Sequence, residues 1–109
     1  MDHIDQAAVL SLKEVMEDDF PLLMTTFLQD AEKRLILLNQ LIGSDDADAI
    51  RRAAHSFKGS CGNVGAQILA SYCAHLEHKA ANQDVGNIQE DVDRIREEFN
   101  LVKKIIVAL

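Results

Sequence analysis

A histidine and a lysine three residues apart are the side chains of this sequence best suited to do chemistry together. His55 and Lys58 occur in the stretch AAHSFKGSCGNVGA, residues 53–66, which also holds three of the chain's five glycines. An imidazole is mostly neutral near pH 7, and its free ring nitrogen is a nucleophile. A phosphoryl group on that nitrogen would carry about two negative charges, and a lysine one helical turn away would lie beside them. The pair therefore indicates a histidine that accepts a phosphoryl group.

The expected strength of this charge pairing suits a reversible carrier. At a separation of about 5 Å, the attraction between an ammonium group and one phosphoryl charge is under about 1 kcal/mol in water. It is about 3 kcal/mol at an effective dielectric constant of about 20. An attraction of this size orients a phosphoryl group without trapping it.

A helix through this stretch would have two faces of different character. With about 100° between successive residues, one side is apolar and would face a core, and it holds Ile50, Ala53, Ala54, Phe57, Cys61 and Val64. The other side is basic and would face solvent, and it holds Arg51, Arg52, His55, Lys58, Gly59 and Gly62. We interpret Arg51 and Arg52 as charges that attract a partner protein, although an ordinary solvated surface would have the same composition.

Gly59 and Gly62 need an explanation of their own on such a face. A glycine in the middle of a helix costs about 1 kcal/mol relative to alanine. Close packing against a neighbouring helix would place these glycines on the apolar side, and both lie on the basic side instead. We therefore interpret them as clearance that lets a second protein bring its reactive group against the ring of His55.

The elements expected to position these side chains are helices joined by short polar breaks. Five helical segments are expected, at about residues 5–16, 21–43, 44–61, 65–81 and 88–109. The start signals are Asp5 as an N-cap, the run 44–46 for the third helix, and Asn87 with Glu90 as a capping box. Gly43 is expected to end the second helix.

The composition agrees with an all-α chain. One proline and five glycines in 109 residues leave little material for the turns of a sandwich or a barrel. Four amphipathic helices with short connections, preceded by a short additional N-terminal helix, most simply form an antiparallel up-and-down four-helix bundle. A chain of this length is expected to be one domain, spanning residues 1–109.

The charge and the cysteines limit the possible functions. A net charge of -7 argues against a nucleic-acid or anionic-membrane surface as the main role, because such surfaces need a positive footprint. No apolar run suggests a signal peptide or a membrane span, so we expect a cytoplasmic protein. In that reducing compartment Cys61 and Cys73 are expected to be small buried hydrophobic residues, and a disulfide is the weaker alternative.

With these residues in view, the chain resembles a known family. AHSFKGSCGNVGA is similar to the signature of histidine-containing phosphotransfer (HPt) domains, in which Lys-Gly follows the histidine at the third and fourth positions and Val-Gly-Ala comes shortly after. LKEVMEDDFPLLMTTFLQDAEKRL is similar to the family's opening helices, and CAHLEHKA to its Cys-x-x-Leu-Glu stretch. One departure is Phe57, where many members carry leucine, and both residues are apolar.

The resemblance implies a role for each matching residue. His55 would be the phosphorylated residue, Lys58 would neutralise the phosphoryl group, and Gly59 would permit partner access. Glu77 falls where the family commonly has a glutamine or glutamate that hydrogen-bonds the imidazole and fixes its orientation. A glutamate at the edge of an apolar stripe with no task is the alternative for Glu77.

The resemblance also implies the partners. Family members relay phosphoryl groups between aspartates of receiver domains, which occur in hybrid sensor histidine kinases and response regulators. The receiver supplies the acidic pocket and the Mg²⁺, so this chain would be a monomeric carrier with no cofactor of its own and not an enzyme. Docking is expected to use the His55 face and apolar residues of the first two helices.

Two rival functions are compatible with parts of the sequence. A metal site could draw on His75, His78 and Glu77 with the two cysteines nearby. A helical projection places His75 and His78 on the polar side and Cys73 on the apolar side, so no tetrahedral set of ligands converges. A binding-only helical bundle would dock receiver domains without passing phosphate. Nothing in the sequence favours this second rival, because His55, Lys58 and Gly59 are all present.

Overall fold

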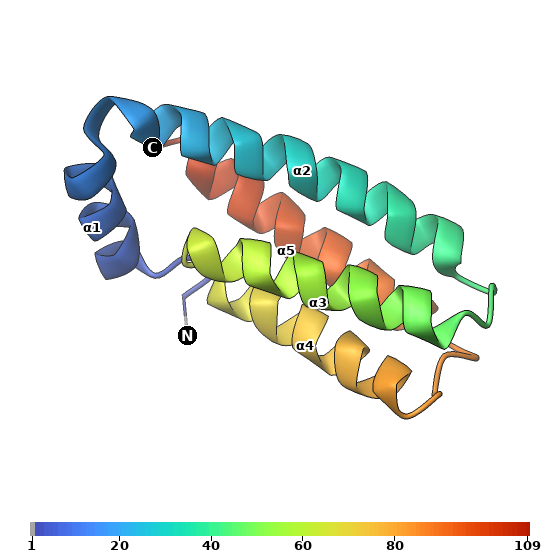
Figure 1. The fold of residues 1–109 in the computed structure, drawn as a ribbon. Coiled ribbons are helices and arrows are strands. Elements are labelled where there is room, and N and C mark those ends of the chain that lie inside the picture. Colours follow the sequence, from blue (N-terminus) through green and yellow to red (C-terminus); the bar gives the residue numbers. More distant parts are fainter. Residues whose placement is uncertain (1) are drawn as a thin grey trace.

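The computed structural model describes residues 2–109, which form five α-helices and one short 3-10 turn (Figure 1). The elements, in chain order, are α1 (Gln6–Met16), η1 (Glu17–Asp19), α2 (Phe20–Leu41), α3 (Ala47–Asn63), α4 (Gln67–Ala81) and α5 (Gln89–Val107). The 3-10 turn between α1 and α2 was not expected from the sequence. The other elements match the expected segments apart from shifts at their ends.

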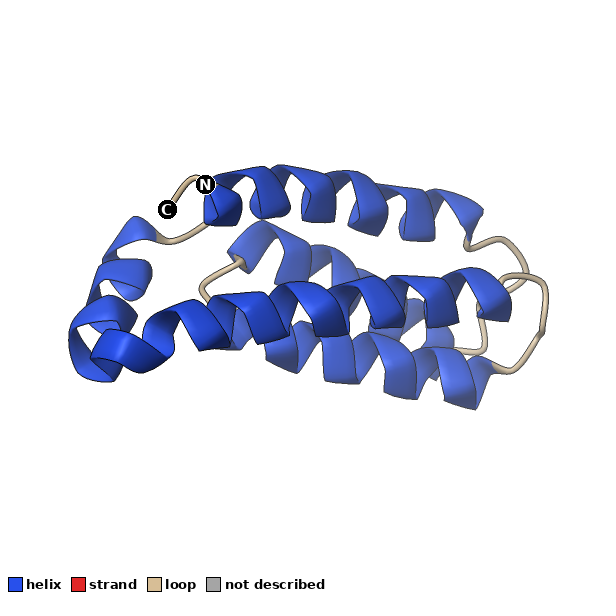
Figure 2. Ribbon diagram, turned by 90° about the horizontal axis from the view of Figure 1, so that it is seen from above, coloured by secondary structure: helices blue, strands red, loops and turns tan. Residues whose placement is uncertain are grey.

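The four longer helices form an antiparallel bundle, as predicted. Each of them packs against the next along the chain, and α5 returns to pack against α2. Figures 1 and 2 show α1 at one end of this bundle, beside the start of α2. The molecule is elongated, with extents of 43 × 24 × 20 Å. The fold is therefore the predicted up-and-down four-helix bundle with a short additional N-terminal helix.

The core lies along the middle of the bundle and is aliphatic with a few phenylalanines. The rings of Phe27 on α2 and Phe99 on α5 approach to 6.4 Å between centroids. The predicted core face of α3 is buried, with Ala53 only partly so and with Ile50, Ala54, Phe57 and Cys61 fully enclosed, and Val64 directly after the helix is fully enclosed too. Burial of each large apolar side chain contributes about 1.5–3 kcal/mol, and it fixes which side of α3 faces outward.

Cys61 and Cys73 are both free thiols inside the core, as expected. The neighbouring thiol of Cys73 and burial together raise the pKa of Cys61, so this thiol stays protonated. Both residues therefore pack α3 against α4 as small hydrophobic side chains.

The caps of α1 and α3 follow the sequence, and the cap of α5 does not. Asp5 and Asp46 each accept a hydrogen bond at 3.1 Å from a backbone N–H three residues on. The predicted capping box of Asn87 and Glu90 is absent, because the cap position of α5 is Ile88 and no side chain caps it. Ile88 is buried in the core, and we attribute the position at which α5 begins to the packing of this side chain.

Gly65 was expected to begin the fourth helix, and that expectation is wrong by two residues. Gly65 lies in the turn before α4 with φ of +74°, a conformation that glycine adopts without strain. Its carbonyl accepts a hydrogen bond of 2.9 Å from the N–H of Asp5, and a Cβ at this position would lie 3.3 Å from Cβ of Ala8. Gly65 therefore marks a close approach between α1 and the turn that joins α3 to α4.

Candidate functional site

The imidazole of His55 is held by a carboxylate from the neighbouring helix. Nδ1 of His55 on α3 lies 2.8 Å from Oε2 of Glu77 on α4, and 64% of the His55 side chain is exposed. An ionised carboxylate can only accept a hydrogen bond, so Nδ1 carries the proton. In the neutral ring the lone pair is then on Nε2, and the exposed ring can offer it to a second molecule.

Lys58 binds the other oxygen of the same carboxylate. Its Nζ lies 2.6 Å from Oε1 of Glu77, whose side chain is 20% exposed. The Lys58 ammonium, and secondarily the His55 ring, lower the pKa of Glu77 against the opposing effect of partial desolvation. Glu77 is therefore ionised at neutral pH and bridges two side chains of α3.

The packing of α3 against α4 explains how residues 22 positions apart meet. Val64 and Ala66 are buried in the turn between the helices, and the N–H of Ala66 donates to the carbonyl of Cys61 at 3.0 Å. This turn fixes α4 antiparallel to α3. On α4 the buried stripe is Leu69, Cys73, Leu76 and Ala80. Glu77 follows Leu76 directly and therefore lies at the border of the stripe, facing His55.

Gly59 and Gly62 leave open space beside this cluster, as predicted. A Cβ at either position would meet no atom within 4 Å outside its local helix backbone. Neither glycine is therefore required for packing within the chain. Because Gly59 and Gly62 have no side chains, nothing projects from these two positions beside His55, and a second protein could approach the ring there.

Arg51 and Arg52 lie on the predicted face, but their contacts run toward the start of α3. Arg51 Nη2 and Arg52 Nε bind the two oxygens of Asp48, at 2.9 Å and 3.2 Å. The hydrogen bond from Arg51, with the nearby charge of Arg52, lowers the pKa of Asp48. The structure therefore gives each arginine a partner other than His55, and their role toward a partner protein stays a prediction.

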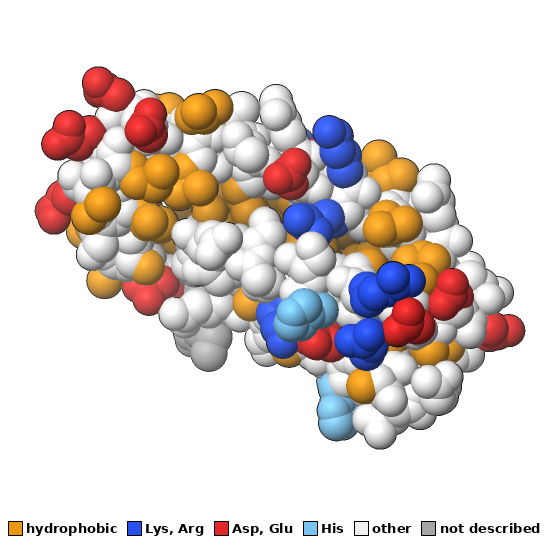
Figure 3. Space-filling model, viewed as in Figure 1, with side chains coloured by type: hydrophobic (Ala, Val, Ile, Leu, Met, Phe, Trp, Pro, Cys, Tyr) orange, Lys and Arg blue, Asp and Glu red, His pale blue; other side chains and the backbone are white. Residues whose placement is uncertain are grey.

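Sequence reasoning missed Arg34, which joins this basic face from α2. Its Nη1 donates a hydrogen bond to Oγ of Ser56, the residue after His55. Figure 3 shows lysine and arginine side chains gathered around an exposed histidine on this side of the molecule. No local pattern indicates Arg34, because it reaches the site only through the packing of α2 against α3.

Two hollows border the glycine side of the site, the first mainly apolar and the second with a mixed polar and apolar lining. One lies between α1 and the end of α3 and is lined by Ala8, Ser11, Leu12, Val15, Gly62, Asn63 and Gly65. The other lies between α2 and α3 and is lined by Leu23, Thr26, Phe27, Asp30, Ser60, Asn63 and Val64. Val15 is 82% exposed. The structure thus specifies which apolar residues of the first two helices border the His55 face.

The side chains of the rival metal site face different neighbours. His75 Nε2 lies 3.5 Å from Asp91 Oδ1, and the amide nitrogen of Asn82 lies 3.4 Å from His78 Nε2. Glu77 faces His55 instead. Within residues 2–109, no three His, Cys, Asp or Glu side chains lie together in a way that could hold a metal ion. Nor is any helix of this part of the chain both long and apolar enough to cross a membrane.

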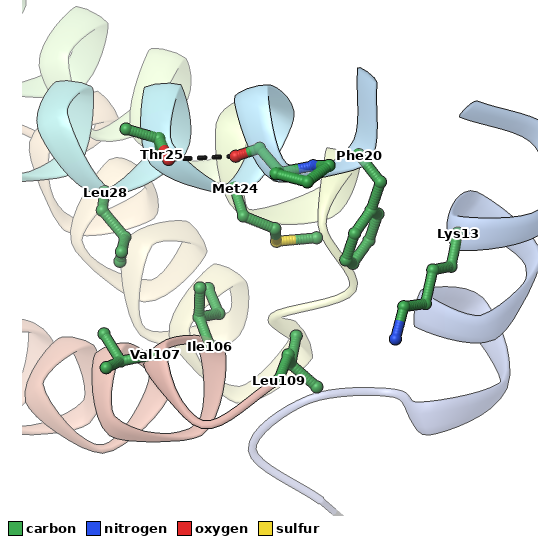
Figure 4. Close-up of a pocket in the computed structure, with 9 residues that line it drawn as sticks. Lys13, Phe20, Met24, Thr25, Leu28, Ile106, Val107 and Leu109 are labelled. Carbon is green, nitrogen blue, oxygen red and sulfur yellow. Dashed lines mark hydrogen bonds between the residues drawn. The ribbon is translucent and has the colours of Figure 1, made fainter. Parts of the chain in front are cut away.

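A further pocket of about 310 Å³ lies at the end of the bundle where α2 begins and α5 ends. Its lining is apolar apart from Thr25 and Lys13, and the Lys13 ammonium lies 5.9 Å from the centroid of the Phe20 ring (Figure 4). The lining side chains include no imidazole, thiol or carboxylate. This pocket therefore lacks the nucleophile and the acid–base pair that the His55 cluster provides.

Comparisons with known proteins identify the family to which the chain is similar. Residues 22–104 match the family model described as Hpt domain. The phosphorelay protein LuxU of Vibrio vulnificus is 27% identical over 93 residues, which are 84% of this chain and 81% of LuxU. The sensor protein TorS of Escherichia coli is 36% identical over 56 residues, which are 51% of this chain and 6% of TorS.

A solved structure is similar over almost the whole chain. It is the crystal structure of histidine-containing phosphotransfer protein B (HptB) from Pseudomonas aeruginosa PAO1. The TM-score is 0.94 and the sequence identity is 39%, over 97% of this chain and 92% of the other. The similarity therefore covers the whole bundle together with the helices that carry the candidate site.

Proposed function

Because this chain belongs to the Hpt domain family, we propose that it carries a phosphoryl group on His55, taking it from one receiver-domain aspartate and passing it to another. The observation that carries the proposal is the contact of His55 Nδ1 with Glu77, which leaves Nε2 as the free nucleophile of an exposed ring. The similar proteins named phosphorelay protein and phosphotransfer protein support the same function.

The transfer step needs no proton to leave the ring. Nε2 attacks the phosphorus of an aspartyl phosphate, the N–P bond forms, the acyl P–O bond breaks, and the aspartate leaves as a carboxylate. The ring gains positive charge in this step. The Glu77 carboxylate, which accepts the hydrogen bond from Nδ1, stabilises that charge and is already in position before the reaction. The reverse step returns the phosphoryl group to the aspartate of a second receiver.

Lys58 would serve the phosphoryl group once it is in place. Its side chain is 38% exposed, so the ammonium can turn from Glu77 Oε1 toward a phosphoryl group on Nε2. In this proposal Mg²⁺ belongs to the acidic pocket of the receiver, and the carrier binds no cofactor of its own. We also propose that the carrier acts as a monomer in the cytoplasm, where the free thiols of Cys61 and Cys73 would persist.

The receiver would dock over the surface of α3 beside His55, where Gly59 and Gly62 have no side chains. Gly59 and Gly62 give room for its active-site loops, and the two hollows offer apolar contacts to its surface. We propose Leu12 and Val15 of α1 and Leu23 of α2 as the principal apolar contacts. Such side chains lose their exposure to water on docking, which stabilises the complex.

The test is phosphoryl transfer from purified, labelled receiver domains encoded by the source genome. Label should move to this chain and show the acid-labile, alkali-stable behaviour of phosphohistidine. His55→Gln should accept none, and His75→Gln should accept as much as the wild type, because His75 faces Asp91 on the other side of α4. The proposal fails if no receiver labels the chain or if His55→Gln is labelled like the parent. Binding without labelling would identify a binding-only bundle.

A further inference from the structure

A groove between α2 and α3 borders His55 on the side opposite the Glu77 contact. It has a volume of about 340 Å³, and α2 contributes Arg34, Leu37 and Leu41 while α3 contributes Arg52, Ala53 and Ser56. The α3 residues flank His55 in the sequence, so the groove and the imidazole belong to one continuous surface. The two hollows near Gly62 lie further along α3, and the groove is separate from them.

The groove combines an apolar surface with two guanidinium groups. Leu37 is 44% exposed, and Leu41 and Ala53 are partly buried beside it, so the three form an apolar floor between the helices. Arg34 and Arg52 supply the positive charge. This combination suits an amphipathic segment that offers apolar side chains together with carboxylates.

Both guanidinium groups are available to a second protein. Arg34 forms no ion pair within residues 2–109, donates a hydrogen bond to Ser56, and has a buried Nε with no acceptor. Arg52 binds Asp48 at 3.2 Å, but both side chains of this pair are more than 60% exposed. Exposed pairs of this kind contribute little to stability, so Arg52 can exchange Asp48 for another carboxylate. An arginine binds a carboxylate through two parallel hydrogen bonds when the geometry allows.

We propose that this groove binds an acidic, amphipathic segment at the edge of the receiver domain that docks on His55, and that it thereby discriminates among receivers. The inference rests on the proposed function and adds a second contact region to it. The chain as a whole has a net charge of -7 and repels acidic surfaces. The basic groove therefore sets the orientation in which an acidic segment can approach.

Two other occupants fit the groove less well. A nucleic acid would need a wide positive surface, whereas this groove has two arginines in an acidic chain and apolar residues between them. A second copy of this chain could offer the acidic turn Glu17–Asp19, which has exposed Val15 and Leu22 on either side. Two copies, however, each carry a net charge of -7 and repel one another. Both alternatives are outcomes of the experiment below.

The experiment uses two matched pairs of substitutions on α2. Arg34→Glu is compared with Lys33→Glu, which makes the same change of charge one residue earlier and outside the groove. Leu37→Ser is compared with Ile36→Ser, because Ile36 is 58% exposed and does not line the groove. Circular dichroism and urea unfolding of all four variants establish that each is folded before transfer is measured.

The measured quantity is the initial rate of phosphoryl transfer against receiver concentration. We expect Arg34→Glu to raise the half-saturating concentration about tenfold and Leu37→Ser about three- to tenfold, with maximal rates within about twofold of the parent. Lys33→Glu and Ile36→Ser should stay within about twofold in both parameters. A receiver in which an acidic edge residue is changed to lysine should recover binding to Arg34→Glu.

The outcomes separate this inference from the proposed function. If the groove variants and their controls have the same half-saturating receiver concentrations, the proposed role of the groove is overturned, and phosphoryl transfer on His55 is left intact. A wild-type chain that no receiver labels overturns the proposed function. A dimer in analytical ultracentrifugation that Arg34→Glu dissociates, or binding of an oligonucleotide that this substitution abolishes, would assign the groove to another occupant and overturn the inference.

Discussion

At the scale of single residues, one carboxylate organises the candidate site. Glu77 binds His55 through Oε2 and Lys58 through Oε1. The contact with Nδ1 selects which ring nitrogen keeps the proton, and it also orients the ring. In the proposed transfer Glu77 would therefore act as a positioning residue, through its contact with His55.

Substitutions of Glu77 should separate hydrogen bonding from charge. In Glu77→Gln the amide oxygen can still accept from Nδ1, so we expect the maximal transfer rate to fall less than about fivefold. Glu77→Leu loses a charge-assisted hydrogen bond, for which about 1.5–3 kcal/mol is typical, so we expect a fall of about 10- to 100-fold. Nitrogen-15 NMR of the His55 ring provides the readout, because only the leucine variant should lose the preference for the Nδ1–H tautomer. An unchanged tautomer in Glu77→Leu would contradict the positioning role.

The lowered pKa of Glu77 predicts a pH dependence of stability. Ionised Glu77 stabilises the fold above the ordinary glutamate pKa of about 4.3, and this contribution is lost as pH falls through the lowered pKa of the folded state. The free energy of unfolding should therefore differ between wild type and Glu77→Gln by up to about 1 kcal/mol. We expect this difference to persist from pH 7 to about pH 5 and to shrink below about pH 4. Urea unfolding at each pH measures it, and a difference that disappears by pH 6 would rule the explanation out.

Substitutions of Gly59 should affect the stability of the chain and the rate of phosphoryl transfer in opposite directions. A Cβ there meets no neighbour, so Gly59→Ala should stabilise the chain by about 0.5–1 kcal/mol in urea unfolding. Gly59→Leu should remain folded but reduce transfer about tenfold or more, because its side chain occupies the approach to His55. An unfolded leucine variant would show instead that Gly59 serves packing.

At the scale of elements, α1 depends on the turn between α3 and α4 for its position. The N–H of Asp5 donates to the carbonyl of Gly65, and Gln67 Nε2 donates to Asp5 Oδ2 at 3.1 Å. Ile4 is buried, and His3 Nδ1 lies 2.7 Å from the buried Glu98 on α5. These contacts fix the start of α1, and α1 carries two of the three side chains proposed to contact the receiver.

Two glycines offer a matched test of how α1 is positioned. Gly65→Ala and Gly43→Ala both place a Cβ at positive φ, but only the Cβ at residue 65 meets another element, at 3.3 Å from Ala8. Both should lose about 1–2 kcal/mol of stability from backbone strain. Gly65→Ala should lose more, and it alone should raise the half-saturating receiver concentration. Equal behaviour of the two variants in urea unfolding and in transfer would contradict the role of Gly65.

At the scale of the whole molecule, one core holds the helices that bear the site. Phe57 is fully buried and lies two residues after His55 on the opposite side of α3. Its ring helps to fix the rotation of α3, and that rotation determines which residues face outward. The same four-helix packing brings Arg34 of α2 and Glu77 of α4 to the two sides of His55.

Truncation of this core should destabilise the whole bundle. Phe57→Ala should cost about 3–5 kcal/mol, a large share of the total of about 5–15 kcal/mol that is usual for a folded protein. Phe57→Leu matches the residue that many family members carry and should cost less than about 1.5 kcal/mol. Ile36→Ala, at an exposed position, should stay within about 0.5 kcal/mol. Urea unfolding provides all three values, and a small cost for Phe57→Ala would contradict this account of the core.

The parts of the structure that the sequence predicted are the local ones. The two faces of α3, the cap Asp5, the capping run 44–46 and the open sides of Gly59 and Gly62 follow from residues within a few positions of one another. Helical periodicity and capping act over one or two turns, so neighbours in the chain encode them. The resemblance to a family added Glu77, and the structure places this residue against His55.

The tertiary structure alone decided the contacts between helices. No local pattern in the sequence indicates three of these features. They are the hydrogen bond from Arg34 to Ser56, the backbone contact of Asp5 with Gly65 that positions α1, and the start of α5 after Ile88 in place of the expected capping box. Each depends on the rotation and register with which whole helices pack, and these are set by the summed burial of many side chains. The sequence by itself thus determined which side of α3 faces outward with His55. The packing of α2, α4 and α1 around it determined which side chains join His55 there.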